Sequence, residues 1–136
     1  MSSLDTNVIV RHLAQANPDQ QRRADAFFRE LASGAASTRL PEGVLVESVQ
    51  VLESKNLYNM PRDVIRVWLT SLLGLRGVRI PKKRLYYRAL DLYASFPRLS
   101  FVACLCVAYG EREGDTTVVT FDQDFDRVPS IRRQEP

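Results

Sequence analysis

Acidic residues near the ends of two expected strands carry the clearest chemical signal in this sequence. Asp5 ends a short strand expected over residues 3–5, and Asp122 follows a β-branched, apolar strand over residues 116–120 that we expect to be buried. If both strands are central and parallel, their carboxylates meet at one edge of a sheet, where their charges repel. A bound divalent cation removes that penalty, and an all-oxygen ligand set favours Mg²⁺ or Mn²⁺ over zinc.

Glu47 is the third candidate acid. It lies on a helix that Pro41 opens, with Val44 and Val51 as its neighbours at i−3 and i+4. We expect an acid flanked in this way to be partly buried and to need a partner. Asp124 and Asp126 follow Asp122 closely and could supply a further ligand or an outer contact that orients one.

Each acid also has a simpler interpretation, which the sequence alone leaves open. Asp5 could cap the helix that follows it, because Asp is a common N-cap residue. Glu47 could be a solvated helix acid. The segment from Asp122 to Asp126 could be an ordinary Asp-rich turn.

Short strands that alternate with helices are expected to position these acids. Helices are expected over residues 6–14, 17–34, 41–54, 61–74, 82–96 and 100–113, with further strands over residues 35–40, 78–80 and near Ile131. Ser100 is the expected N-cap of the last helix. This alternation predicts an α/β fold with a mainly parallel sheet and right-handed crossovers, built as one domain over residues 1–136.

The composition is that of an ordinary globular domain. Hydrophobic residues make up 45% of the 136 residues and charged residues 26%, which argues against disorder and against a disulfide scaffold. No apolar run approaches the ~20 residues that span a bilayer. Cys104 and Cys106 point away from each other on a helix, so we expect reduced thiols and a cytoplasmic location. The net charge of +3 permits contact with nucleic acid without requiring it. Scattered basic residues could meet RNA phosphates, although solvated helix surface is their simpler interpretation; they include Arg11, Lys82, Lys83 and Arg84.

Four segments in order resemble the motifs of PIN-domain proteins, specifically the VapC toxin branch. They are LDTNVIVRHL at residues 4–13, PEGVLVESVQVLES at 41–54, SFVACLCVAYGERE at 100–113 and VVTFDQDFDRVP at 118–129. The first carries a metal-binding Asp at Asp5, the second the family's glutamate at Glu47, and the fourth its acid at Asp122. The resemblance covers nearly the whole chain.

The resemblance implies a three-layer α/β/α sandwich with a central parallel sheet and an endoribonuclease that uses Mg²⁺ or Mn²⁺. The metal would be held by Asp5, Glu47 and Asp122, and the reaction would be hydrolysis of RNA phosphodiester bonds. Hydrogen bonds that orient these carboxylates would come from Thr6, Asn7 and Thr120, for which ordinary turn and cap roles are equally good interpretations. Members of the VapC branch are usually dimeric and are silenced by a VapB antitoxin.

Ala103 departs from the family pattern, which has an aspartate at this position. With Ser100 as N-cap, residue 103 is the third residue of the helix, where a carboxylate would face the positive end of the helix dipole. The chain is therefore expected to bind metal weakly and to cleave little. Either it is a naturally degenerate member or the residue was replaced deliberately to spare the producing cell. The intact acids at the other positions favour replacement.

Two other classes of protein remain as alternatives. A non-catalytic module could use the same fold to hold RNA or an antitoxin peptide. A phosphatase or receiver-like α/β protein also uses strand-end aspartates, but those families place a second acid near the first strand, and Asp5-Thr6-Asn7 has none.

Overall fold

Two units, each with its own parallel strands, make up the computed structural model, which describes residues 1–14 and 17–136. The N-terminal unit spans Met1–Pro81 and the C-terminal unit spans Lys82–Pro136. Strands alternate with helices along both, and every strand pairing is parallel. The prediction of an α/β fold with a parallel sheet flanked by helices is therefore confirmed.

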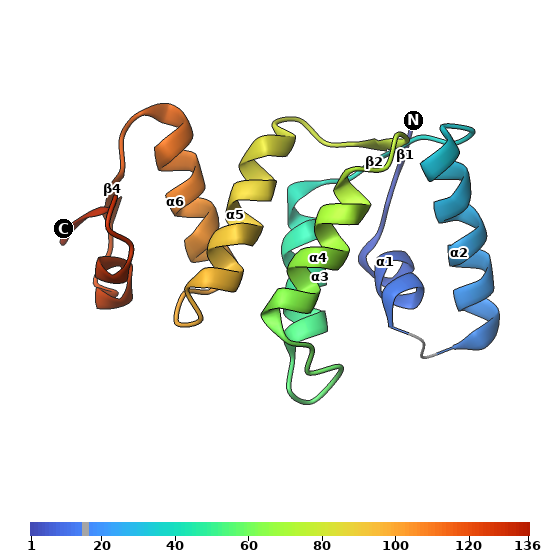
Figure 1. Ribbon diagram of the computed structural model, residues 1–136, viewed down its shortest axis with the longest axis horizontal. Coiled ribbons are helices and arrows are strands. Elements are labelled where there is room, and N and C mark those ends of the chain that lie inside the picture. Colours follow the sequence, from blue (N-terminus) through green and yellow to red (C-terminus); the bar gives the residue numbers. More distant parts are fainter. Residues whose placement is uncertain (15–16) are drawn as a thin grey trace. The chain divides into compact units, whose positions relative to one another are not determined.

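A three-stranded parallel sheet organises the N-terminal unit, in the order β1-β2-β3. Its elements are β1 (Ser2–Ser3), α1 (Thr6–Leu13), α2 (Pro18–Ser33), β2 (Thr38–Arg39), α3 (Glu42–Glu53), α4 (Arg62–Leu73) and β3 (Val78–Arg79). In the register, Ser2 lies opposite Thr38, which in turn lies opposite Val78. Helix α1 packs against both α2 and α3, and α3 packs against α4 (Figure 1).

Local capping chemistry sets the limits of α2 as the sequence predicts. The side chain of Asn17 accepts a hydrogen bond from the backbone N–H of Gln20 at 3.0 Å, with Pro18 in the first turn. The helix ends at Gly34, whose φ of 83° lies in the left-handed region that glycine adopts without strain. Both helix ends were readable because each depends on neighbouring residues only.

The packing of α1 on α3 fixes the spacing of the two candidate acids in this unit. Ile9 and Val10 of α1 and Leu45 and Val49 of α3 are at most 2% exposed. Burying each aliphatic side chain of this size contributes about 1.5–3 kcal/mol. Burial of these side chains stabilises the packing of α1 against α3, which both carry candidate acids at their exposed positions.

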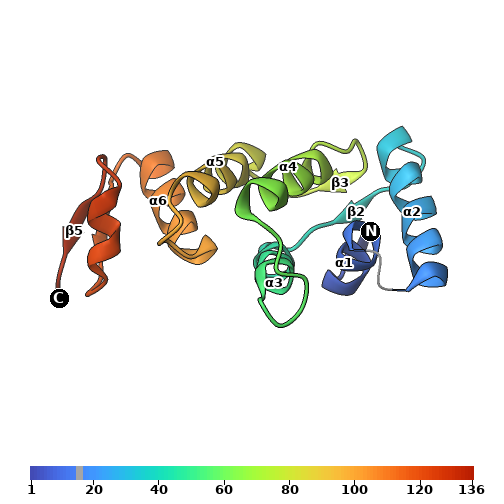
Figure 2. The same cartoon turned by 60° about the horizontal axis from the view of Figure 1, so that its bottom comes forward.

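The C-terminal unit is built on a pair of packed helices. Its elements are α5 (Lys83–Ser95), α6 (Phe101–Glu113), β4 (Thr117–Val119), the 3₁₀ helix η1 (Gln123–Arg127) and β5 (Arg132–Gln134). Helices α5 and α6 lie side by side (Figure 2). Tyr93 meets Phe101 edge to face at 5.8 Å between ring centroids, and Arg88 pairs with Glu111 at 2.8 Å. The hydrogen bond to Glu111 raises the pKa of Arg88.

Two details of the expected strands are wrong. Strand β1 ends at Ser3 rather than Asp5, because Leu4 makes the last ladder hydrogen bond, to Arg39, and Asp5 already turns into α1. Strand β4 was expected to be buried, but Val119 is 62% exposed, since β4 pairs with β5 alone. Within the described strand pairings β1 is an edge strand, so the premise of two central strands in one sheet is not met.

None of the described helices combines the length and the apolar character that crossing a membrane requires.

Candidate active site

Asp5 stands at the N-terminus of α1 without using its carboxylate to cap the helix. Its backbone is extended (φ −103°, ψ 157°), as an N-cap residue requires, yet its side chain makes no capping hydrogen bond. The side chain is exposed and faces the positive end of the helix dipole. The capping interpretation is thus right about the position and wrong about the hydrogen bond, so the carboxylate remains available for another partner.

Glu47 lines the same hollow as Asp5. This hollow, which we call the acidic hollow, has a volume of about 380 Å³ and lies between α1 and α3. Thr6, Asn7 and Arg11 also line it, and Leu57 and Tyr58 contribute from the loop after α3. Two carboxylates expected from the sequence to share a site are therefore brought together within one unit.

The expectation that Glu47 is partly buried is wrong. The side chain is exposed, as in the alternative of a solvated helix acid. At 100° per residue, Glu47 points about 200° away from Leu45, the centre of the buried face of α3. Its valine neighbours Val44 and Val51 are only half-buried and do not cover it. The carboxylate reaches the acidic hollow from the solvent side of the helix.

The hydroxyl of Thr6 is a buried polar atom without a partner. Thr6 is 6% exposed, and its Oγ1 makes no hydrogen bond to any described residue. A buried hydroxyl left in this state is destabilising, so such atoms usually serve a ligand or an ordered water. Thr6 lines the acidic hollow together with Asp5 and Glu47, so its hydroxyl is near a place where a ligand or an ordered water could bind.

The N-terminus of α6 is capped by the side chain of the residue that precedes the helix. Ser100 is the N-cap, and its Oγ accepts a hydrogen bond from the N–H of Ala103 at 3.1 Å, which confirms the predicted cap. Ala103 is 9% exposed, so its methyl group faces the packed interior of the unit. A carboxylate here would be largely desolvated and would need a cation or a donor to offset that cost.

Asp122 is held in a defined turn at the start of η1. Its backbone N–H donates to Thr120 Oγ1 at 2.9 Å, and its Oδ1 accepts from the N–H of Asp124 at 2.9 Å. Thr120 therefore orients the Asp122 backbone. The interpretation as an Asp-rich turn is correct for the local geometry, and it leaves a ligand role for Asp122 as a prediction.

The two remaining acids of this turn pair with arginines. Asp124 lies 3.3 Å from the Nε of Arg127, and Asp126 accepts from the Nε of Arg133 at 3.1 Å. Hydrogen bonds to Glu135 and Asp126 raise the pKa of Arg133. Both carboxylates thus stabilise the turn, and contact with a metal or its ligands stays a prediction for them.

The predicted site residues are divided between the two units. The acidic hollow of the N-terminal unit is lined by α1, α3 and the loop after α3. It holds four of the predicted residues, Asp5, Thr6, Asn7 and Glu47. Ala103, Thr120 and Asp122 belong to the C-terminal unit. Among the described residues, no three His, Cys, Asp or Glu side chains form a metal-binding group.

Sequence reasoning missed Arg11 as a member of this site. It was one of several scattered basic residues whose simplest interpretation was solvated helix surface. Its side chain lines the acidic hollow together with Asn7, four positions earlier on α1. That i, i+4 spacing puts both residues on one helix face, and it is the signal that could have identified Arg11.

Comparison with known families decides where this fold belongs. A family profile described as PIN domain matches residues 3–131, nearly the whole chain and parts of both units. The chain belongs to the PIN domain family. PIN domains are generally metal-dependent nucleases that use divalent ions, in accord with the oxygen donors around the acidic hollow. No curated protein matches the chain closely enough to add a narrower assignment to this PIN domain.

Proposed function

We propose that this chain is a VapC-type toxin, a PIN-domain endoribonuclease that hydrolyses RNA phosphodiester bonds with Mg²⁺ or Mn²⁺. The observation that carries the proposal is the carboxylate of Asp5, which makes no capping hydrogen bond to α1 and lines the acidic hollow together with Glu47. The side chain of an acid that only capped α1 would accept a hydrogen bond from a backbone N–H of the helix. The unpartnered hydroxyl of Thr6 supports the same proposal, because Thr6 also lines the acidic hollow.

The proposed roles follow from the chemistry of each side chain. Asp5 and Asp122 hold the cation directly or through water, and Glu47 holds the cation or its water. A bound Mg²⁺ or Mn²⁺ supplies a more acidic water and neutralises charge that builds on the phosphate. Thr6 and Asn7 orient the carboxylates from α1, and Thr120 orients the Asp122 turn through its 2.9 Å hydrogen bond.

Ala103 is the reason that cleavage by this exact chain is expected to be weak. The position lies at the N-terminal turn of α6, where the family resemblance puts a metal-binding aspartate. A methyl group offers no ligand there, so the cation is held by fewer negative charges. We infer a lower affinity for the metal and a slower reaction, with the other acids of the set still present.

The remaining parts of the proposal rest on the resemblance to the VapC branch. They are an RNA substrate, a VapB-type antitoxin as partner, a homodimeric state, a cytoplasmic location and a single PIN domain over residues 1–136. The net charge of +3 is compatible with an RNA substrate. The length of the chain suits a small single-domain toxin.

A second candidate function is a non-catalytic PIN-fold module that binds RNA or an antitoxin. The buried methyl group of Ala103 favours it, because a binding protein has no need of the full acidic set. Under this alternative, the exposed acids Asp5 and Glu47 would contribute to recognition without holding a catalytic cation.

The two candidates separate when the missing acid is restored. The Ala103→Asp chain is incubated with several RNA substrates in Mg²⁺, in Mn²⁺ and in EDTA, beside the unaltered chain. The ribonuclease proposal expects cation-dependent cleavage well above that of the unaltered chain. A restored chain that cleaves none of these RNAs in either cation would overturn it in favour of the binding module.

A further inference from the structure

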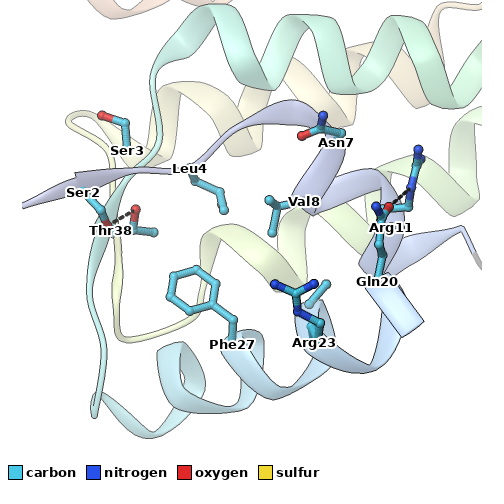
Figure 3. Close-up of a pocket in the computed structure, with 11 residues that line it drawn as sticks. Ser2, Ser3, Leu4, Asn7, Val8, Arg11, Gln20, Arg23, Phe27 and Thr38 are labelled. Carbon is cyan, nitrogen blue, oxygen red and sulfur yellow. Dashed lines mark hydrogen bonds between the residues drawn. The ribbon is translucent and has the colours of Figure 1, made fainter. Parts of the chain in front are cut away.

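A second hollow opens on the N-terminal unit between β1, α1 and α2, and it has the mixed lining of a ligand site. Its volume is about 600 Å³, which falls in the range of small-molecule pockets. Leu4, Val8 and Ala24 line it with apolar side chains, which we call its apolar floor, and Arg11 and Arg23 contribute two guanidinium groups. Figure 3 shows Leu4, Val8, Arg11 and Arg23 around the hollow. None of the residues that line it is acidic. We call this the basic hollow.

Arg23 and Phe27 place a guanidinium group and an aromatic ring on the same side of α2. They stand four residues apart on α2, so both project from one face of the helix. Both side chains reach toward Leu4 and Val8 across the basic hollow (Figure 3). Phe27 is half-buried, which leaves part of its ring open to a flat partner. Its place in this hollow is not explained by the acidic site.

The basic hollow and the acidic hollow meet over α1. Asn7 and Arg11 line both of them. The guanidinium of Arg11 is held in place by its Nε, which donates to Gln20 Oε1 at 2.8 Å (Figure 3). A single extended chain lying across α1 could therefore occupy both hollows, with Arg11 between its two positions.

We propose that the basic hollow is a subsite for one nucleotide of a single-stranded RNA, next to the nucleotide whose phosphodiester lies at the acidic hollow. The base stacks on Phe27 against the apolar floor, and Arg23 and Arg11 contact the phosphates on either side. Guanidinium groups match phosphate oxygens in pairs, and any base can stack on an aromatic ring. The inference rests on the proposed ribonuclease function for the identity of the neighbouring site.

The structure supplies a matched pair of arginines for the test. Arg22 and Arg23 are adjacent on α2, their side chains are 77% and 78% exposed, and both lie near Asp19, at 3.2 Å and 3.9 Å. Only Arg23 lines the basic hollow. Arg22→Gln and Arg23→Gln therefore remove the same charge from neighbouring exposed positions. Arg22 also loses a hydrogen bond to Asp19, and Arg23 alone of the two loses a place in the hollow.

The probe is a short single-stranded RNA with a fluorescent label, and its binding to the full chain is followed by anisotropy in EDTA at several salt concentrations. Removing one phosphate contact should reduce the salt slope by about 0.7 and weaken binding by about fivefold at 0.1 M salt. We expect this loss for Arg23→Gln and a change of less than about twofold for Arg22→Gln. Phe27→Leu should weaken binding by about fivefold through lost stacking. Thermal unfolding of each variant confirms that it is folded.

The outcomes distinguish this inference from the proposed function. Equal effects of Arg22→Gln and Arg23→Gln, or no RNA binding at all, would overturn the subsite. The same substitutions are then made with Ala103→Asp and assayed for cleavage. If that chain cleaves RNA and Arg23→Gln leaves its KM unchanged, the ribonuclease stands and the subsite is wrong. If it fails to cleave while the Arg23-specific loss of binding persists, the subsite stands and the ribonuclease proposal is wrong.

Discussion

Two helices of this PIN domain begin at family motifs, and only one of them is capped by a side-chain hydrogen bond at its N-terminus. At α6, Ser100 caps the N–H of Ala103 at 3.1 Å, and the buried third residue carries only a methyl group. At α1, Asp5 occupies the cap position but makes no capping hydrogen bond, and the next residue, Thr6, has an unpartnered hydroxyl. The first arrangement serves the stability of its helix. The second leaves oxygens unused, as a binding site for a cation requires.

The largest expected effect is on catalysis at the start of α1. In the Ala103→Asp chain, Asp5→Asn should lower the rate of RNA cleavage by about 100-fold or more, because it removes a charge that stabilises the transition state through the cation. Single-turnover cleavage assays in Mg²⁺ measure this loss. The control is Asp63→Asn, which removes an exposed acid from the first turn of α4 that lines neither hollow. If both variants cleave at similar rates, Asp5 has no special role.

A smaller effect should separate the two helix N-termini in stability. Ser100→Ala should cost about 1 kcal/mol of the free energy of unfolding, because it removes a capping hydrogen bond. Asp5→Ala should cost much less, since its side chain makes no such bond. Urea denaturation in EDTA measures both. A loss at Asp5 as large as that at Ser100 would mean that its carboxylate caps α1 in solution, and the contrast would disappear.

The smallest effect concerns the two buried threonines of the N-terminal unit. Thr6→Val should raise the free energy of unfolding by about 0.5 kcal/mol in EDTA, because it replaces an unpaired buried hydroxyl with a methyl group. Thr38→Val is the control and should lower it by about 1 kcal/mol. Thr38 Oγ1 accepts a hydrogen bond from Ser2 at 2.9 Å, and the residue is 1% exposed. A loss of stability in Thr6→Val would show that its hydroxyl has a partner after all.

Features that depend on neighbouring residues were predictable from the sequence. Asn17 and Ser100 cap their helices through contacts three residues away, and Gly34 ends α2 with a positive φ. The order of helices and strands followed from apolar periodicity, and the parallel pairing followed from their alternation. Each of these signals is written into a short window of sequence.

Features that depend on packing between distant segments were not predictable in the same way. The hollow that joins Asp5 to Glu47 exists because α1 packs on α3, and the isolation of the Thr6 hydroxyl is a property of that packing. The exposure of Glu47 was misjudged because its valine neighbours flank the apolar face and do not cover it. The edge position of β1 depends on which strands pair, and a run of β-forming residues does not encode its partners.

The central claim is that this chain is a metal-dependent ribonuclease weakened at one ligand position. The most direct measurement compares RNA cleavage by Ala103→Asp and Ala103→Asn, two side chains of the same shape that differ in charge, across a titration of Mn²⁺. We predict Mn²⁺-dependent cleavage by Ala103→Asp that is about 100-fold faster than by Ala103→Asn, which should behave like the unaltered chain. Equal rates for the two variants, or cleavage that persists in EDTA, would contradict the proposed function.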